Sequence, residues 1–345
     1  MIYKRLVCPR HNVVELVEST LPDKLADNQV LLRNTFGAEK HGTMEAFVRK
    51  YGNKRGAWDP KRLLHTPRKG VAWAYPIPLG NMQVGYVEKV GSTVSRYKVG
   101  DRLVCFRGFE PYSVINETEG WLIQKDTCWK AATCLDPATF ALAALRDSNT
   151  RIGDAVAIFS LGAIGLMAVA LAKMAGCYPI IAIDLVESRR KVAERLGADI
   201  TLNPVGLDVG LKLRELTHWR GVDKVIEYSG AVSALNAALR GVVFGGTVAC
   251  GAFPAPYPEG LDFGGEAHMN RPNIVFTRTE SDPNRDHPNW DNVRVRKTIL
   301  RLIIEGKIDG QAVVSPVIKF SDNLAADYER IIADKDHSIK LGIEY

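Results

Sequence analysis

A short glycine-containing turn and one acid that follows it are the residues with the clearest chemical meaning in this chain. The turn is Ser160–Gly165, and Asp184 lies about 20 residues beyond Gly162. Glycine lets the backbone approach a phosphate, and the first N–H groups of a helix attract its negative charge. A carboxylate at this spacing accepts hydrogen bonds from ribose hydroxyls. The pattern therefore predicts a binding site for a dinucleotide.

The residues of this predicted site divide by the part of the dinucleotide that each would contact. The turn would hold the pyrophosphate, while Asp184 would bind the adenosine ribose and repel a 2′-phosphate, so NAD is favoured over NADP. The nearby Arg189 keeps NADP open as an alternative. Ser160 stands where the usual pattern has its first glycine. The cofactor contacts predicted are Ser160, Gly162, Ala163, Ile164, Gly165, Asp184, Arg189, Ser229 and Gly251.

The elements around the turn alternate as a parallel sheet with covering helices requires. A β-prone run over Ala155–Phe159 leads into the turn, and an apolar helical pattern follows as far as Ala175. A second β-prone run over Pro179–Ile183 then ends at Asp184. The alternation continues and gives six strands of a doubly wound sheet. The turn splits the long apolar stretch into a strand and a helix too short to span a membrane.

Composition and charge narrow the function classes. The chain has 345 residues, enough for two domains, and its 46% hydrophobic and 24% charged residues are ordinary for a globular protein. Its six cysteines include no C-x-x-C pair, which favours reduced thiols in the cytoplasm over a disulfide scaffold. Many of the basic residues fall in one short loop without a nucleic-acid-binding motif. We therefore expect neither a nucleic-acid partner nor a membrane partner.

Several motifs resemble those of the medium-chain dehydrogenase/reductase superfamily, in the branch of threonine, sorbitol and zinc alcohol dehydrogenases. The stretch Gly80–Gly91 is similar to the family's Gly-His-Glu segment and the strand after it, and Lys98–Leu103 matches its Gly-Asp-Arg turn. Short strand-like runs dominate this part of the chain. The resemblance implies an α/β protein with a GroES-like, β-rich catalytic domain over residues 1–132 and 296–345. A Rossmann domain over residues 133–295 would lie between these two segments.

The positions that match the family's catalytic zinc ligands carry different residues here. Zinc-dependent members use a cysteine, then a histidine, then a cysteine or glutamate. In this chain His41, Asn81 and Asp136 take these three places, and a neutral amide is a poor zinc ligand. The closely spaced cysteines of a structural zinc lobe are also missing from the sequence. We therefore expect no catalytic zinc, and whether His41 and Asp136 retain a metal stays open.

Without zinc, side chains must take the proton of an alcohol during hydride transfer. Thr43 matches the family hydroxyl that hydrogen-bonds the substrate oxygen. The adjacent His41 is the candidate base, since its ordinary pKa lies near ~6.5. Lys40 is another candidate, as a base or as a cation that polarises a carbonyl. Asp136 would orient His41. For His41, Lys40 and Asp136 alike, the alternative is an ordinary polar residue without a catalytic role.

Charge and aromatic residues indicate a polar substrate. Between Arg49 and Lys69 the chain has eight Lys or Arg residues, one acid and Trp58. Such a loop could steer an anionic substrate or stack on a sugar ring, with a solvated surface loop as the alternative. Asn81, Trp58 and Arg271 are the candidate substrate contacts.

Together these features predict an NAD-dependent oxidoreductase that acts without catalytic zinc on a polar secondary alcohol or its ketone. A sugar, a cyclitol or a hydroxy acid is the substrate class expected. An NAD(P)H-dependent, zinc-free enone or quinone reductase is the alternative enzyme. A non-catalytic nucleotide-binding redox sensor is the alternative from another class. The resemblance further implies a homodimer or homotetramer formed through the sixth strand of the Rossmann domain.

Overall fold

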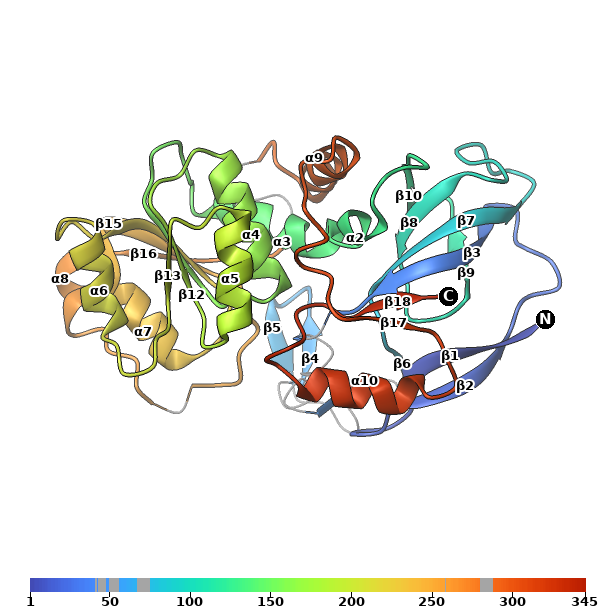
Figure 1. The fold of residues 1–345 in the computed structure, drawn as a ribbon, viewed down its shortest axis with the longest axis horizontal. Coiled ribbons are helices and arrows are strands. Elements are labelled where there is room, and N and C mark those ends of the chain that lie inside the picture. Colours follow the sequence, from blue (N-terminus) through green and yellow to red (C-terminus); the bar gives the residue numbers. More distant parts are fainter. Residues whose placement is uncertain (41, 43–47, 50–55, 67–74, 258, 280–287) are drawn as a thin grey trace. The chain divides into compact units, whose positions relative to one another are not determined.

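Two units built from different parts of the chain make up the fold (Figure 1). The computed structural model describes residues 1–40, 42, 48–49, 56–66, 75–257, 259–279 and 288–345. The first unit comprises residues 1–133 and 314–345, and the second comprises residues 134–313. The boundary expected at 295/296 is wrong, because it falls inside helix α9 (Asn292–Ile304). That helix buries Val295, Ile299 and Ile303 and packs against α3 of the second unit.

A parallel six-stranded sheet forms the centre of the second unit, with the strand order β13-β12-β11-β14-β15-β16. Every residue of the neighbouring strands β11 and β12 is buried, as a sheet covered on both faces requires. The strand order reverses between β11 and β14, and ligands bind at such a point beyond the carboxyl ends of the strands. The doubly wound sheet is confirmed. Its strands are β11 (Val156–Phe159), β12 (Ile180–Ile183), β13 (Ile200–Leu202), β14 (Val222–Glu227), β15 (Val242–Cys250) and β16 (Asn273–Phe276).

Helices of the second unit pack in two groups (Figure 1). Helices α3, α4 and α5 contact one another in succession, and α6, α7 and α8 do the same. Val209 and Leu213 of α6 share an apolar core with Phe159 of β11 and Val225 of β14. The bounds of these helices are α3 (Leu135–Asp147), α4 (Ala163–Met174), α5 (Glu187–Leu196), α6 (Val209–Leu216), α7 (Val232–Gly241) and α8 (Glu266–Asn270).

Mainly antiparallel sheets form the first unit, which is β-rich as predicted, and only β17 and β18 pair in parallel among its described strands. The larger sheet has the order β10-β8-β7-β3-β18-β17, with β9 also paired to β3, and a smaller sheet has the order β2-β1-β6. Strands from both ends of the chain therefore complete one sheet. Its elements are β1 (Ile2–Cys8), β2 (Glu15–Thr20), β3 (Gln29–Ala38), β4 (Ala57–Asp59), β5 (Leu64–Thr66), β6 (Ile77–Pro78), β7 (Met82–Val90), β8 (Arg102–Phe106), β9 (Tyr112–Asn116), β10 (Gly120–Ile123), α2 (Trp129–Ala132), β17 (Val317–Lys319), α10 (Leu324–Ala333) and β18 (Gly342–Glu344).

One core of the first unit lies between α10 and the strands beside it. Tyr328 and Ile331 of α10 pack with Leu6 of β1 and Ile343 of β18. Strand β17 starts at Val317, directly after Pro316, which has no N–H for a sheet ladder. None of the helices in the described part of the chain combines the length and apolar character needed to cross a membrane.

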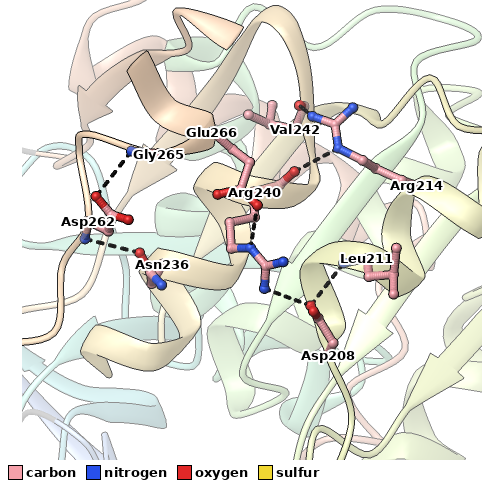
Figure 2. A network of polar contacts seen from close by, with 9 residues as sticks. All are labelled: Asp208, Leu211, Arg214, Asn236, Arg240, Val242, Asp262, Gly265 and Glu266. Atoms are coloured by element: carbon pink, nitrogen blue, oxygen red, sulfur yellow. Dashed lines mark hydrogen bonds and ion pairs between the residues drawn. The ribbon is translucent and has the colours of Figure 1, made fainter. Parts of the chain in front are cut away.

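A polar network ties three helices of the second unit together (Figure 2). Arg240 at the end of α7 donates hydrogen bonds to Asp208 Oδ1 and Glu266 Oε1, each at 2.8 Å. The carboxylate of Asp208 also caps α6, because it accepts the N–H of Leu211 at 3.0 Å. Arg214 of α6 donates to the carbonyl oxygen of Arg240 at 2.8 Å. Asp208 therefore serves both a helix end and an ion pair.

Replacement of Asp208 separates these two roles. Asp208→Ala is expected to lower the free energy of unfolding by about 1 kcal/mol, the usual value of an N-cap. Asp208→Asn keeps a side-chain oxygen for the cap and loses only a partly exposed ion pair, which contributes little. Urea unfolding followed by circular dichroism measures both changes. An equal loss in the two variants would contradict the capping role.

Candidate active site

The turn after β11 has the backbone shape of a phosphate-binding turn. Ser160 has a φ of 74°, in the left-handed region where glycine is most common, so a serine holds the conformation of the usual first glycine. Gly162 begins α4 as its N-cap with a φ of −67° and has no side-chain cap. The first N–H groups of α4 are therefore open to an anion, as the sequence predicted.

The two glycines of the turn have different reasons to lack a side chain. A Cβ placed on Gly165 would lie 1.8 Å from the carbonyl oxygen of Ser160. A Cβ placed on Gly162 would meet no atom of the described chain within 4 Å. Gly165 therefore permits the close packing of α4 against the turn. Gly162 instead leaves open space above the backbone, where a phosphate could approach.

Asp184 joins the end of β12 to this turn. Its side chain is buried, with Oδ2 accepting the N–H of Leu161 at 2.6 Å and Oδ1 accepting that of Val186 at 2.8 Å. A carboxylate has about four acceptor positions, so room remains for ribose hydroxyls. Arg190 donates to the carbonyl oxygens of Asp184 and Leu185 at 2.7 and 2.8 Å. Its guanidinium thus holds the same loop at the sheet edge.

A second buried carboxylate organises the turn after β14. Glu227 accepts the N–H groups of Ser229 and Gly230 at 2.6 and 3.1 Å, and it also accepts the Ser229 hydroxyl. Burial raises the pKa of Glu227. Sequence analysis missed this residue, although an acid at a strand end before Ser-Gly was a usable signal. The N–H and hydroxyl of Ser229, a predicted cofactor contact, are thus both engaged within the turn.

Gly251, another predicted cofactor contact, has a packing role. A Cβ at this position would lie 2.3 Å from the ring of Tyr228. The hydroxyl of Tyr228 donates to the carbonyl oxygen of Phe140 at 3.0 Å, and burial raises the pKa of this phenol. Gly251 therefore lets the Tyr228 ring pack beside the end of β15.

Arg189, another predicted cofactor contact, is partly buried on α5, close to Asp184 in sequence.

In the first unit, the end of β3 brings several predicted residues together. The N–H of Asn81 donates to the carbonyl oxygen of Ala38 at 3.0 Å, and its buried Nδ2 has no hydrogen-bond acceptor among the described residues. Glu39 is fully buried, and its Oε1 accepts the N–H of Lys40 at 2.8 Å. Lys40, Glu39 and Asn81 therefore lie around one strand end. His41 and Thr43 lie outside the described residues.

Glu39 lies within a buried polar cluster that the sequence did not reveal. The hydroxyl of Tyr328 from α10 hydrogen-bonds its carboxyl group, and Lys340 donates from Nζ to its carbonyl oxygen at 2.5 Å. Burial raises the pKa of Glu39 to about 7, against the opposing effects of the Lys40 N–H and the Lys340 charge. Burial, followed by the charge of Glu39, holds the pKa of Tyr328 well above its ordinary value. Close to neutral pH this carboxyl group is therefore partly protonated.

The remaining predicted residues lie in separate elements. Asp136 is buried in the first turn of α3 in the second unit, where a helix dipole favours a negative charge. Trp58 on β4 is half exposed and stands edge-on to His65 of β5, with ring centroids 5.3 Å apart. Arg271 is exposed and ends α8 with a φ of 50°. Within the described ranges, no three His, Cys, Asp or Glu side chains form a metal-binding group.

Comparison with known proteins decides the family. The chain is 38% identical over 358 residues to the D-guloside 3-dehydrogenase of Escherichia coli K12, and the match covers 99% of this chain and 100% of that protein. The chain belongs to the medium-chain dehydrogenase/reductase superfamily. The sequence model of the family described as zinc-binding dehydrogenase matches residues 163–280 of this chain. The protein is therefore an oxidoreductase, and the predicted family is confirmed.

Solved structures of other dehydrogenases have the same fold. A protein described as a short chain alcohol dehydrogenase from E. coli CFT073, complexed with NADH, matches with a TM-score of 0.78 at 16% identity over 100% of this chain and 99% of that one. A dehydrogenase from Sinorhizobium meliloti 1021, bound to NADP, matches with a TM-score of 0.78 at 18% identity over 100% of both chains. These likenesses confirm the combination of a GroES-like unit with a Rossmann unit.

Proposed function

We propose that this oxidoreductase transfers a hydride between NAD and a secondary hydroxyl of a sugar or polyol, without catalytic zinc. The observation that carries the proposal is the open glycine turn before α4, tied to the buried carboxylate of Asp184. The substrate class is supported by the relative of 38% identity, which is named for the dehydrogenation of a guloside at its 3-position. The substrate is a small polar molecule, and basic residues around Trp58 would favour an anionic one.

The choice of NAD over NADP follows from charge. Asp184 places a negative charge where the 2′-phosphate of NADP would lie. Arg190, a nearby cation, is turned to the carbonyl oxygens of Asp184 and Leu185. Repulsion of the 2′-phosphate by Asp184 therefore outweighs its attraction to Arg190. Arg189 would contact the adenosine ribose beside Asp184, and Ser229 and Gly251 would line the path of the cofactor beyond the turn.

The proton of the alcohol would pass through side chains at the end of β3. Thr43 would hydrogen-bond the substrate oxygen, His41 would accept its proton, and Asp136 would orient His41. Lys40 is the second candidate for the base. The amide of Asn81 stands at a ligand position of the zinc-dependent members. Its Nδ2, which has no acceptor among the described residues, suits a substrate hydroxyl better than a metal. Trp58 and Arg271 would complete the substrate contacts.

Two measurements test this proposal. Purified protein is expected to reduce NAD with sugars, glycosides or polyols, to use NADP less well, and to keep its activity after treatment with a chelator. His41→Ala is expected to lower kcat about 10²- to 10⁴-fold if His41 is the base. Close to one zinc per chain, with activity lost on chelation, would overturn the zinc-free part. Tight NAD binding without turnover on a broad panel would favour a redox sensor.

Assembly and location are also proposed. The outer edge of β16 is open within the described sheet, and Phe276 on this strand is 83% exposed. Pairing of this edge with a second copy would produce the homodimer or homotetramer that the family resemblance implies. None of the six cysteines, all within the described residues, forms a disulfide, which supports a reducing compartment such as the cytoplasm.

A further inference from the structure

Two arginine side chains stack on one tryptophan in the second unit. The Cζ atom of Arg146, in the last turn of α3, lies 3.3 Å from the ring centroid of Trp290. The Cζ atom of Arg294, on α9, lies 4.0 Å from the same centroid. Two guanidinium groups cannot share one face of an indole at these distances, because their atoms would come closer than van der Waals contact. The ring of Trp290 is therefore held between two cations.

This pair of cations has no counter-charge among the described residues. Burial and the charge of Arg294 lower the pKa of Arg146, and no described acid opposes these two effects. The neighbouring carboxylate of Asp291 caps α9, where it accepts the N–H of Arg294 at 2.7 Å. Like charges at short range repel each other, and a partly buried arginine normally has an anionic partner. The local charge would therefore be balanced by a bound anion.

The N–H donors of both guanidinium groups are available to such an anion. The five donors of Arg146 find no acceptor in the described part of the chain, and none of its nitrogen atoms is sealed from solvent. Arg294 is exposed, and among the described residues its guanidinium donates only from Nη1, to the carbonyl oxygen of Asn289 at 3.0 Å. A ligand in solution can therefore reach both cations.

The two arginines lie away from the predicted cofactor turn. The carbonyl oxygen of Phe140, on α3, accepts the hydroxyl of Tyr228, which directly follows β14 at the carboxyl edge of the sheet. With a rise of 1.5 Å per residue, Arg146 lies about 9 Å further along α3, and from there the chain goes on to the start of β11. An anion at Arg146 would therefore occupy a site separate from the one proposed for the dinucleotide.

We propose that Arg146 and Arg294 together bind a phosphate group at the rim of the Trp290 ring. Two guanidinium charges match a phosphate, which carries up to two negative charges near neutral pH, better than a carboxylate with one. Guanidinium N–H groups also form charge-assisted hydrogen bonds with phosphate oxygens. The phosphate group may be that of the free ion or of a phosphate ester. Once bound, it would link the first and last described helices of the second unit.

A titration with inorganic phosphate at pH 8 and constant ionic strength tests this inference. Wild-type protein is expected to show a saturable change in tryptophan fluorescence, and Trp290→Phe is expected to remove that change. Arg146→Met and Arg294→Met keep a long unbranched side chain, and each is expected to weaken phosphate binding about ten- to hundredfold. Because Arg294 is exposed, its variant still decides the question if Arg146→Met fails to fold.

A matched variant isolates the effect of the two arginines. Arg301→Met removes another arginine of α9, which pairs with Glu305 at 2.9 Å, and is expected to leave phosphate affinity unchanged. Equal affinity in the wild type, Arg146→Met and Arg294→Met would assign phosphate to another place, such as the glycine turn, and would overturn the inference. A wild-type signal that does not saturate, or one that persists in Trp290→Phe, would overturn it as well.

Other anions test the chemistry of the ligand. Acetate carries one charge and is expected to bind at least about tenfold more weakly than phosphate, whereas equal binding would overturn the choice of a phosphate. Glucose 6-phosphate bound at least as tightly as inorganic phosphate would identify an ester as the ligand, and binding of inorganic phosphate alone would identify the free ion. Both arginine variants are expected to bind NADH like the wild type, so failure of this inference would leave the proposed function standing.

Discussion

Gly165→Ala is expected to destabilise the protein by about 3 kcal/mol and to abolish cofactor binding. The new Cβ would lie 1.8 Å from the carbonyl oxygen of Ser160. That oxygen belongs to the backbone of the turn, so the clash cannot be relieved by a change of side-chain rotamer. Helix α4 would have to move away from β11, and the buried residues between them would lose packing. Urea unfolding and NADH titration measure the two effects.

Gly162→Ala is the matched control, because it makes the same chemical change three positions earlier. Its Cβ would meet no described atom within 4 Å, and the φ of −67° suits any residue. Stability is therefore expected to stay within about 0.5 kcal/mol of the wild type. NADH affinity is expected to fall about tenfold, since the methyl group would occupy the space needed by the pyrophosphate. Equal destabilisation by both substitutions, or normal NADH binding by Gly162→Ala, would contradict this division of roles.

The parts of the fold that the sequence predicted are those set by neighbouring residues. The turn at Ser160–Gly165, the strand before it and the helix after it each follow from residue types within one short segment. Repetition of such segments identified the doubly wound sheet. The boundary at 295/296 was wrong because the packing of α9 against α3 depends on residues about 150 positions apart, which no local pattern records.

The candidate site shows the same limit at the level of side chains. Asp184 was predicted because its spacing from the glycine turn belongs to one βαβ unit. The buried cluster around Glu39 was not predicted, because nothing near Glu39 in sequence points to Tyr328 or Lys340. Sequence patterns therefore predicted the cofactor turn well and the buried polar contacts poorly.

The buried carboxyl group of Glu39 predicts a pH dependence of stability. Its pKa rises from 4.5 to about 7 in the folded protein, mainly through burial. The folded state then holds the proton more tightly than the unfolded state does. The resulting stabilisation is fully present below pH 4.5 and is lost as the pH rises through about 7. A change of this size corresponds to about 3 kcal/mol.

Glu39→Gln removes this titration while keeping the shape of the side chain and one acceptor for the Lys40 N–H. The free energy of unfolding of the wild type is expected to fall by about 3 kcal/mol more than that of Glu39→Gln between pH 4.5 and pH 8. Urea unfolding at several pH values measures the difference, with Glu18→Gln on the exposed face of β2 as the matched control. Parallel curves for the wild type and Glu39→Gln would show that Glu39 is ionised throughout. Its charge would then be balanced inside the fold by Lys340, whose Nζ lies beside the Glu39 carbonyl oxygen.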